Sequence, residues 1–193
     1  MSARPNASSQ QQAIERAIAL YGETRPFIVA DIGSQAGWLK AAGHHPRNLY
    51  LSGPMGLSPS VALGLALCRP QGQVLCVVGD GALAMNLSAL ATIQAAAPAN
   101  LALLVIANHI YEFTASLPTP TGRLDWVALG RAMFGEAASF DLADMTAERW
   151  SAAPRPAFLV AETAPSGKPP PLGLSPAQIR AEFLAASRRE APV

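Results

Sequence analysis

The sequence has little charge, few aromatic residues and only two cysteines. Charged side chains make up 14% of its 193 residues and aromatic ones 6%, against 50% for apolar residues. Two cysteines are too few for a disulfide framework. Cys68 and Cys76 each lie in apolar surroundings, so we expect both to be small core residues of a reduced protein. The net charge of +1 gives no reason to expect nucleic acid as a partner.

Long apolar runs are also absent. No run reaches the roughly 18 to 20 residues that are needed to span a bilayer, and residues 1–12 are polar and lack the apolar core of a signal peptide. These two observations predict a cytoplasmic protein with no membrane partner. A surface with so few charges also favours burial against other chains.

Apolar, β-branched runs alternate with segments of helical periodicity. The runs predict strands at residues 27–33, 49–52, 73–78, 101–107, 137–140 and 157–162. The periodic segments predict helices at residues 9–20, 34–42, 58–68, 82–97, 125–134 and 146–152, and one more from Ser175. The alternation predicts an α/β fold, a parallel sheet of about six strands with helices on both faces. We expect one domain over residues 1–165, then a proline-rich linker and C-terminal helix over residues 166–193.

Gly79-Asp80-Gly81 follows the clearest predicted strand, and Asn108 follows the next strand. Both should lie where the carboxyl ends of parallel strands gather, the usual ligand-binding edge. The glycines let the backbone approach an anion, but the Asp80 carboxylate would repel a bare phosphate unless a divalent cation lay between them. Magnesium suits Asp80, the Asn108 amide oxygen and the Ile110 carbonyl as ligands. The alternative is a tight strand-to-helix turn that the aspartate caps.

These residues resemble the diphosphate-binding motif of thiamine diphosphate-dependent enzymes. The motif in that family is Gly-Asp-Gly, a gap in the twenties, and then usually Asn-Asn. The resemblance extends through residues 53–57 (Gly-Pro-Met-Gly-Leu) and the strand that ends at Asp31-Ile32-Gly33, and so covers roughly residues 25–165. It implies the thiamine diphosphate-binding fold.

The resemblance also implies roles for individual residues. Asp80 and Asn108 would ligate magnesium, together with the carbonyl oxygen of Ile110. Gly79, Gly81 and Ala82 would form the diphosphate cradle, in which Gly81 and Ala82 donate their amides. Met55 would hold the cofactor in its bent form, and the Gly53 carbonyl would accept a hydrogen bond from the aminopyrimidine.

The chain is short for this family. Most such enzymes also contain a pyrimidine-binding domain whose glutamate activates the cofactor, and nothing in this sequence resembles that domain. The resemblance is closest to the small β subunits of sulfopyruvate decarboxylases and to the corresponding half of phosphonopyruvate decarboxylases. These relatives share blocks like residues 47–67 and 90–93 and a C-terminal Ser-Pro helix. A separate α subunit would supply the glutamate, so the resemblance implies a hetero-oligomer with the active site between chains.

Three positions depart from the family pattern. Ala107 replaces the first asparagine of the usual pair, His109 stands where a small residue is common, and Pro54 replaces a small polar residue. His109 and Glu112 follow the proposed metal ligand on a loop that faces the site, where they could bind substrate or relay protons. Alternatively, His109 is a solvated loop residue and Glu112 pairs with an arginine.

The resemblance implies a subunit of a thiamine diphosphate-dependent decarboxylase that acts on a small anionic 2-oxo acid such as sulfopyruvate or phosphonopyruvate. One alternative is carboligation, as in acetolactate synthases. Another is a catalytically silent cofactor-binding or regulatory subunit, for which the altered residues 107–109 are the motivating feature.

Other polar and apolar residues have simpler interpretations. We expect Asp31 to cap the following turn, and Ser34 to cap the helix that begins there. The cluster of His44, His45 and Arg47 could attract an anionic substrate, but a solvated loop is the simpler interpretation. Met85 and Leu87 should be packing residues on the helix at 82–97.

Overall fold

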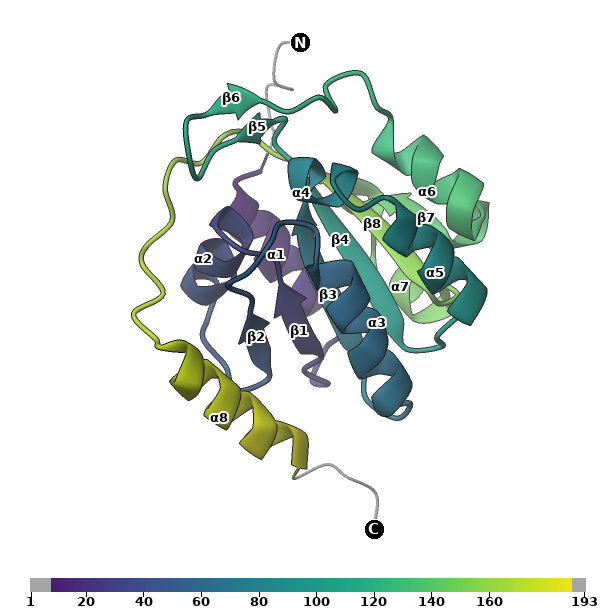
Figure 1. Ribbon diagram of the computed structural model, residues 1–193. Coiled ribbons are helices and arrows are strands. Elements are labelled where there is room, and N and C mark those ends of the chain that lie inside the picture. The colour runs from purple at the N-terminus through teal and green to yellow at the C-terminus, as the bar shows by residue number, and fades with distance from the viewer. Residues whose placement is uncertain (1–7, 189–193) are drawn as a thin grey trace.

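A six-stranded parallel sheet forms the centre of the computed structural model, which describes residues 8–188 (Figure 1). The strand order is β2-β1-β3-β4-β8-β7, with all neighbours parallel. The strands are β1 (Phe27–Ala30), β2 (Asn48–Tyr50), β3 (Val74–Gly79), β4 (Leu101–Ala107), β7 (Ser139–Asp141) and β8 (Ala157–Glu162). The predicted α/β fold class is therefore confirmed.

Helices cover both faces of this sheet and enclose two apolar cores. One face carries α1 (Gln10–Ala19), α2 (Ser34–Ala41) and α7 (Ala147–Ala152), and the other carries α3 (Ser58–Cys68), α5 (Ser88–Ala96) and α6 (Trp126–Phe134). Every residue of β3 and β4 is buried. This is the pattern of a parallel sheet that is buried on both sides, and it explains why these strands appear in the sequence as continuous apolar runs.

The helix predicted at residues 82–97 is in fact two helices. A short helix, α4 (Asp80–Ala84), begins directly after β3, and α5 begins only at Ser88. Between them, the Asn86 side chain donates a hydrogen bond of 2.9 Å to the Gly56 carbonyl. This bond joins the segment between α4 and α5 to the loop at residues 53–57, and it requires Asn86 to lie outside a continuous helix.

Several predicted packing and capping residues are corrected by the structure. Met85 and Leu87 lie at the break between α4 and α5 and are 59% and 39% exposed, so they do not pack in the core. Cys68 is exposed, whereas Cys76 is buried, and burial raises the pKa of the Cys76 thiol to about 12. Ser34 is not a cap, because Gly33 occupies the N-cap position of α2 with a φ of 83°.

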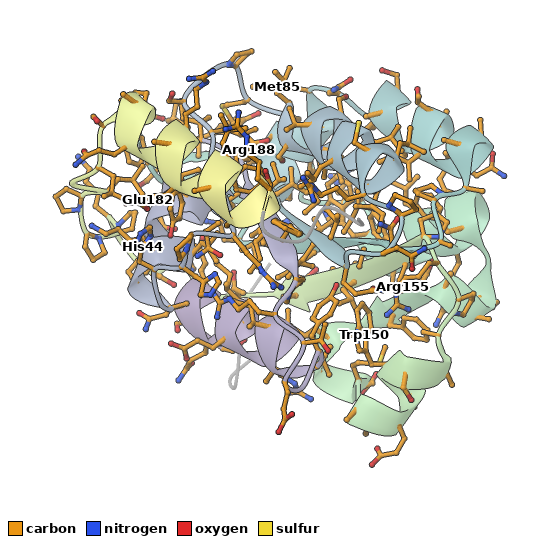
Figure 2. All side chains as sticks on the ribbon, turned by 90° about the horizontal axis from the view of Figure 1, so that it is seen from below. His44, Met85, Trp150, Arg155, Glu182 and Arg188 are labelled. Carbon is orange, nitrogen blue, oxygen red and sulfur yellow. The ribbon has the colours of Figure 1, made fainter. Side chains whose placement is uncertain are left out.

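The cluster of His44, His45 and Arg47 lies just before β2, at the amino edge of the sheet, and so away from the ligand-binding edge. His44 contacts the Tyr50 hydroxyl and Glu182 of α8 (Pro176–Arg188), each at 3.0 Å (Figure 2). Burial, with help from Arg25 and Arg47, lowers the pKa of His45. His44 thus links this partly exposed loop to α8, and the cluster does not lie at the predicted ligand-binding edge.

The C-terminal segment wraps around the domain. Residues 164–175 run past α2, where Lys40 donates to the Leu172 carbonyl, and α8 then packs beside the edge strand β2 (Figure 1). The division of the chain at residue 165 stays a prediction. The polar residues 1–8 predict a frayed end; residues 1–7 lie outside the described part of the chain, and Ser8 instead forms an isolated parallel β-bridge with Thr163. No helix among residues 8–188 is both long and apolar enough to cross a bilayer.

Candidate cofactor-binding site

The predicted site residues gather at the carboxyl edge of the sheet, after the ends of β2, β3 and β4. The chain runs outward from β1 to β2 and then returns to place β3 on the other side of β1. The order of strands therefore reverses between β1 and β3, and loops that diverge at such a switch point leave a crevice where ligands bind in α/β folds. Asp31 and Asp80 follow the two strands at this point.

Asp80 is the first residue of α4 and is 1% exposed. Its Oδ2 atom accepts hydrogen bonds from the hydroxyls of Thr119 at 2.9 Å and Thr121 at 2.5 Å. Among residues 8–188, no side chain or amide donates to its Oδ1 atom. One carboxylate oxygen is therefore held by the protein, and the other is available to a ligand.

Asn108 follows β4 and is 7% exposed. Its Nδ2 group donates to Glu112 Oε2 at 3.0 Å, and its Oδ1 atom accepts a weak bond from the Ile110 amide at 3.3 Å. This pairing fixes the donor end of the amide on Glu112 and leaves the amide oxygen with a second lone pair.

Glu112 is buried, with 6% of its surface exposed. Besides Asn108, its carboxylate accepts hydrogen bonds from the Gln10 side chain and from the Gly167 amide. Its partners are thus two side-chain amides, those of Gln10 and Asn108, and one backbone N–H, so the alternative of an arginine partner is wrong. Three donors from α1, the loop after β4 and the C-terminal segment meet on this one carboxylate.

His109 lies between two carboxylates rather than in solvent. Its side chain is 27% exposed, its Nε2 atom is 2.9 Å from Glu162 Oε2, and its Nδ1 atom is 3.6 Å from Asp80 Oδ2. The Nδ1 atom is buried and has no hydrogen-bond partner among the described residues. The backbone of His109 is in the left-handed region, with a φ of 59°, which few non-glycine residues adopt. This turn aims the ring at the site.

The loop that contains Ile110 folds over the predicted cradle. Residues 110–111 (β5, Ile110–Tyr111) pair with β6 (Leu117–Pro118), and this hairpin lies at the top of Figure 1 beside α4. A Cβ atom on Gly81 would come within 2.6 Å of the Tyr111 ring and 2.7 Å of the Thr119 methyl group. The absence of a side chain at position 81 is what allows this close approach.

The Met55 loop is fixed from beneath by Asp31. This carboxylate is fully buried, and its Oδ2 atom accepts from the Gly56 amide at 3.0 Å and from the Ser58 amide and hydroxyl at 3.3 and 2.8 Å. Its Oδ1 atom also accepts from the adjacent Ile32 amide, so the carboxylate mainly holds a loop distant in sequence and does not cap the following turn as predicted. Gly53 is exposed and Met55 is 37% exposed, so both lie on the surface of this loop.

Four polar residues of the site were not singled out in the sequence. Thr119 and Thr121 hold Asp80, Gln10 holds Glu112, and Gln35 of α2 lies against Gly79, where a Cβ atom would meet its amide nitrogen at 2.8 Å. A threonine in a loop carries no local pattern that marks it. The periodicity of α1 places Gln10 but does not identify its partner.

The oxygens at this edge fit a hard cation and a diphosphate. Asp80 offers a free carboxylate oxygen and Asn108 an amide oxygen. Ile110 pairs with Pro118, which has no amide hydrogen to donate to the Ile110 carbonyl. One carboxylate with neutral oxygens is a typical protein share of a magnesium site that phosphate oxygens and water complete. No cluster of three or more His, Cys, Asp or Glu side chains suited to a metal occurs among the described residues.

Known proteins resemble this chain in sequence and in fold. It is 37% identical over 110 residues to a sulfopyruvate decarboxylase subunit beta of Methanocaldococcus jannaschii, covering 57% of each chain. It is 33% identical over 134 residues to a phosphonopyruvate decarboxylase of Streptomyces viridochromogenes, covering 67% of this chain and 33% of that protein. The alignments thus span only a little over half of the first relative and a third of the second.

A solved benzoylformate decarboxylase from Polynucleobacter necessarius has the same fold, with a TM-score of 0.65 over 88% of this chain and 36% of that one, at 17% identity. Residues 31–145, which include Asp31, Met55, Asp80 and Asn108, match the family described as "Thiamine pyrophosphate enzyme, C-terminal TPP binding domain". This match covers more than half of the sequence. The chain therefore belongs to the thiamine pyrophosphate enzyme family, as its C-terminal TPP-binding domain.

Proposed function

We propose that this chain is the diphosphate- and magnesium-binding subunit of a two-subunit, thiamine diphosphate-dependent enzyme that decarboxylates a small anionic 2-oxo acid, such as sulfopyruvate or phosphonopyruvate. The observation that carries the proposal is the pair of Asp80 and Asn108 at the carboxyl edge of the sheet, inside the segment that matches the family. The named relatives supply the substrate class.

In this proposal, Asp80 Oδ1, Asn108 Oδ1 and the Ile110 carbonyl hold magnesium, while the Gly81 and Ala82 amides, beside Gly79, donate to the diphosphate. The bound cofactor supplies the electron sink on which a 2-oxo acid loses carbon dioxide. In the loop at residues 53–57, which Asp31 holds through the Gly56 amide, the Gly53 carbonyl would accept a hydrogen bond from the aminopyrimidine and the Met55 side chain would support the bent cofactor.

A partner subunit is supported by the chemistry of the surface beside the site. Residues 48–122 contain only three charged side chains, and two of these, Asp80 and Glu112, are buried. The side chains of Met55, Leu57, Met85 and Leu87 are all more than a third exposed, and the Asn86–Gly56 bond brings their two loops together. We propose that a pyrimidine-domain α subunit covers this surface and brings the activating glutamate.

The feature that motivated a silent subunit has a structural origin. Ala107 is fully buried as the last residue of β4 and belongs to the core beneath the site. A ligand role at this position is not needed, because Asn108 is the residue that reaches the edge. The departure at Ala107 therefore gives no argument against a functional magnesium site.

The activity test uses the chain co-expressed with its pyrimidine-domain partner. The purified complex is offered a panel of 2-oxo acids with thiamine diphosphate and magnesium, with and without an acceptor aldehyde, and the products are identified. We expect carbon dioxide and the aldehyde from an anionic substrate. A ligated product formed in place of the aldehyde would support the carboligase alternative. Cofactor binding without turnover of any substrate would support the silent subunit.

We propose that His109 contacts substrate or relays protons, and that Glu112 acts through Asn108. His109 reaches the site from a strained backbone position, and its buried Nδ1 atom has no hydrogen-bond partner among residues 8–188. Glu112 instead has three donors on its two oxygens and little exposed surface. It is therefore a positioning residue, which fixes the orientation of the Asn108 amide.

Glu112→Gln is expected to weaken magnesium-dependent binding of thiamine diphosphate about tenfold and to destabilise the fold by about 1–3 kcal/mol. The new amide must turn a donor toward Gln10, Asn108 or the Gly167 amide, which are all donors. Calorimetric titration and thermal unfolding measure the two effects. Glu23 is exposed, so Glu23→Gln is the control and should change neither quantity. If the variant lost turnover but kept normal cofactor binding and stability, Glu112 would instead be a catalytic residue.

A further inference from the structure

Two threonines from a distant loop surround the carboxylate of Asp80. Thr119 and Thr121 are 7% and 3% exposed. They lie in the loop that follows β4, directly after the β5–β6 hairpin. Both hydroxyls bond to the same oxygen, Asp80 Oδ2. The two hydroxyl oxygens are also only 2.7 Å from each other. Burial of a hydroxyl costs free energy unless the hydroxyl makes a hydrogen bond, so we expect each of these two groups to take part in one.

The proton count limits how these groups can be arranged. Two hydroxyls have two protons between them, yet three short oxygen–oxygen contacts exist among Asp80 Oδ2, Thr119 and Thr121. At least one of the two hydroxyls must therefore donate a hydrogen bond to Asp80 Oδ2, and a network of this kind holds Oδ2 firmly in place. It fixes the plane of the carboxylate and thereby the direction in which Oδ1 points.

The threonines also fasten the loop over the cradle. The Thr119 amide donates to the His109 carbonyl at 2.9 Å, so the backbone at 119 closes back onto the start of the loop. The Thr119 methyl group and the Tyr111 ring both lie against Gly81. The hydroxyl bonds to Asp80 and the contacts to Gly81 thus join the loop to both parts of the proposed diphosphate site.

We propose that Thr119 and Thr121 are positioning residues for the metal ligand. They hold Asp80 Oδ2, orient Oδ1 toward the cation, and keep residues 109–121 closed over Gly81. This inference rests on the proposed function, because the cation and diphosphate come from it. The opposite role would be a gate, in which the two hydroxyls compete with the cation for Asp80 and must leave before magnesium can bind. The structure favours positioning over a gate, because the hydroxyls bond to Oδ2 and no donor among the described residues bonds to Oδ1.

The test is the double variant Thr119→Val/Thr121→Val, which keeps the shape of both side chains and removes both hydroxyls. Calorimetric titration of the two-subunit complex gives the magnesium concentration that half-saturates thiamine diphosphate binding. We expect this concentration to rise about tenfold or more, as when a partner of a metal ligand is lost. Hydrogen exchange of the chain without any cofactor should also become faster at residues 109–121.

Two further variants keep the test decisive. Thr119→Ser/Thr121→Ser retains both hydroxyls and should restore the magnesium requirement and the slow exchange. Thr114→Val, at an exposed threonine of the same loop, should change neither. A valine variant with an unchanged magnesium requirement would overturn the inference, and a lower requirement would establish a gate instead. Failure of the wild-type complex to bind the cofactor would overturn the proposed function itself, which is a separate result.

Discussion

Asp80→Asn is expected to abolish magnesium-dependent binding of thiamine diphosphate to the complex while leaving the fold intact. Asparagine has nearly the same shape but carries no charge, and its amide nitrogen cannot ligate a cation. The side chain is 1% exposed, so water cannot replace the lost oxygen easily. We expect at least about a hundredfold loss of affinity, equivalent to about 2.7 kcal/mol.

Stability should not fall in parallel, because Asp80 is a buried carboxylate with no lysine or arginine among its ion-pair partners in the described residues. Removal of its charge removes a desolvation cost that offsets the loss of hydrogen bonds from the two threonines. Thermal unfolding and calorimetric titration separate the two effects. Asp144→Asn, at an exposed aspartate, is the matched control and should bind the cofactor normally. Normal binding by Asp80→Asn would mean that the magnesium site lies elsewhere.

Asp31→Ala is expected to cause the largest loss of stability among these variants, about 3–5 kcal/mol. The fully buried carboxylate accepts from the Gly56 amide and from both donors of Ser58. Alanine leaves these donors buried without an acceptor. Urea unfolding followed by circular dichroism measures the change, with the slope of the transition expected to stay constant.

The same variant should also weaken cofactor binding, because Asp31 fixes the loop that carries Met55. Ser58→Ala removes one of the bonds but leaves no donor unpaired, so it serves as the matched control with a loss of about 1 kcal/mol. An Asp31→Ala protein as stable as the wild type would show that residues 53–58 are held by other contacts.

The sheet could be predicted from the sequence because its strands are buried on both faces. Residues 101–107 and 157–161 are continuous apolar runs, and the predicted bounds of both strands, 101–107 and 157–162, agree with β4 and β8. The short edge strand β2 is less apolar, yet it follows a clear loop signal at His44-His45-Pro46. Local pattern is sufficient where burial determines the choice of residues.

The break between α4 and α5 could not be predicted, because its cause is a contact distant in sequence. Alanine, leucine and methionine at residues 82–91 all favour a continuous helix. The bond from Asn86 to the Gly56 carbonyl exists only once the two loops are folded together. The exposure of Met85 and Leu87 has the same origin, since both lie at this break.

The candidate site was predicted in part for a similar reason. Asp80 and Asn108 stand at strand ends, so position along the chain locates them. The hydrogen-bond partners at the site come from elsewhere: Thr119 and Thr121, which bond to Asp80, from the end of a loop, and Gln10, which bonds to Glu112, from α1. Sequence spacing gives no signal for such partners, and only the fold shows which donors reach each carboxylate.

Cofactor binding by the wild-type complex is the decisive test of the proposed magnesium and diphosphate site. The chain and its pyrimidine-domain partner are purified together, and thiamine diphosphate is titrated in by calorimetry, once with magnesium and once with a chelator. We expect saturable binding that requires magnesium and both chains. Binding that persists in the chelator, or no binding at all with magnesium and the partner present, would contradict it.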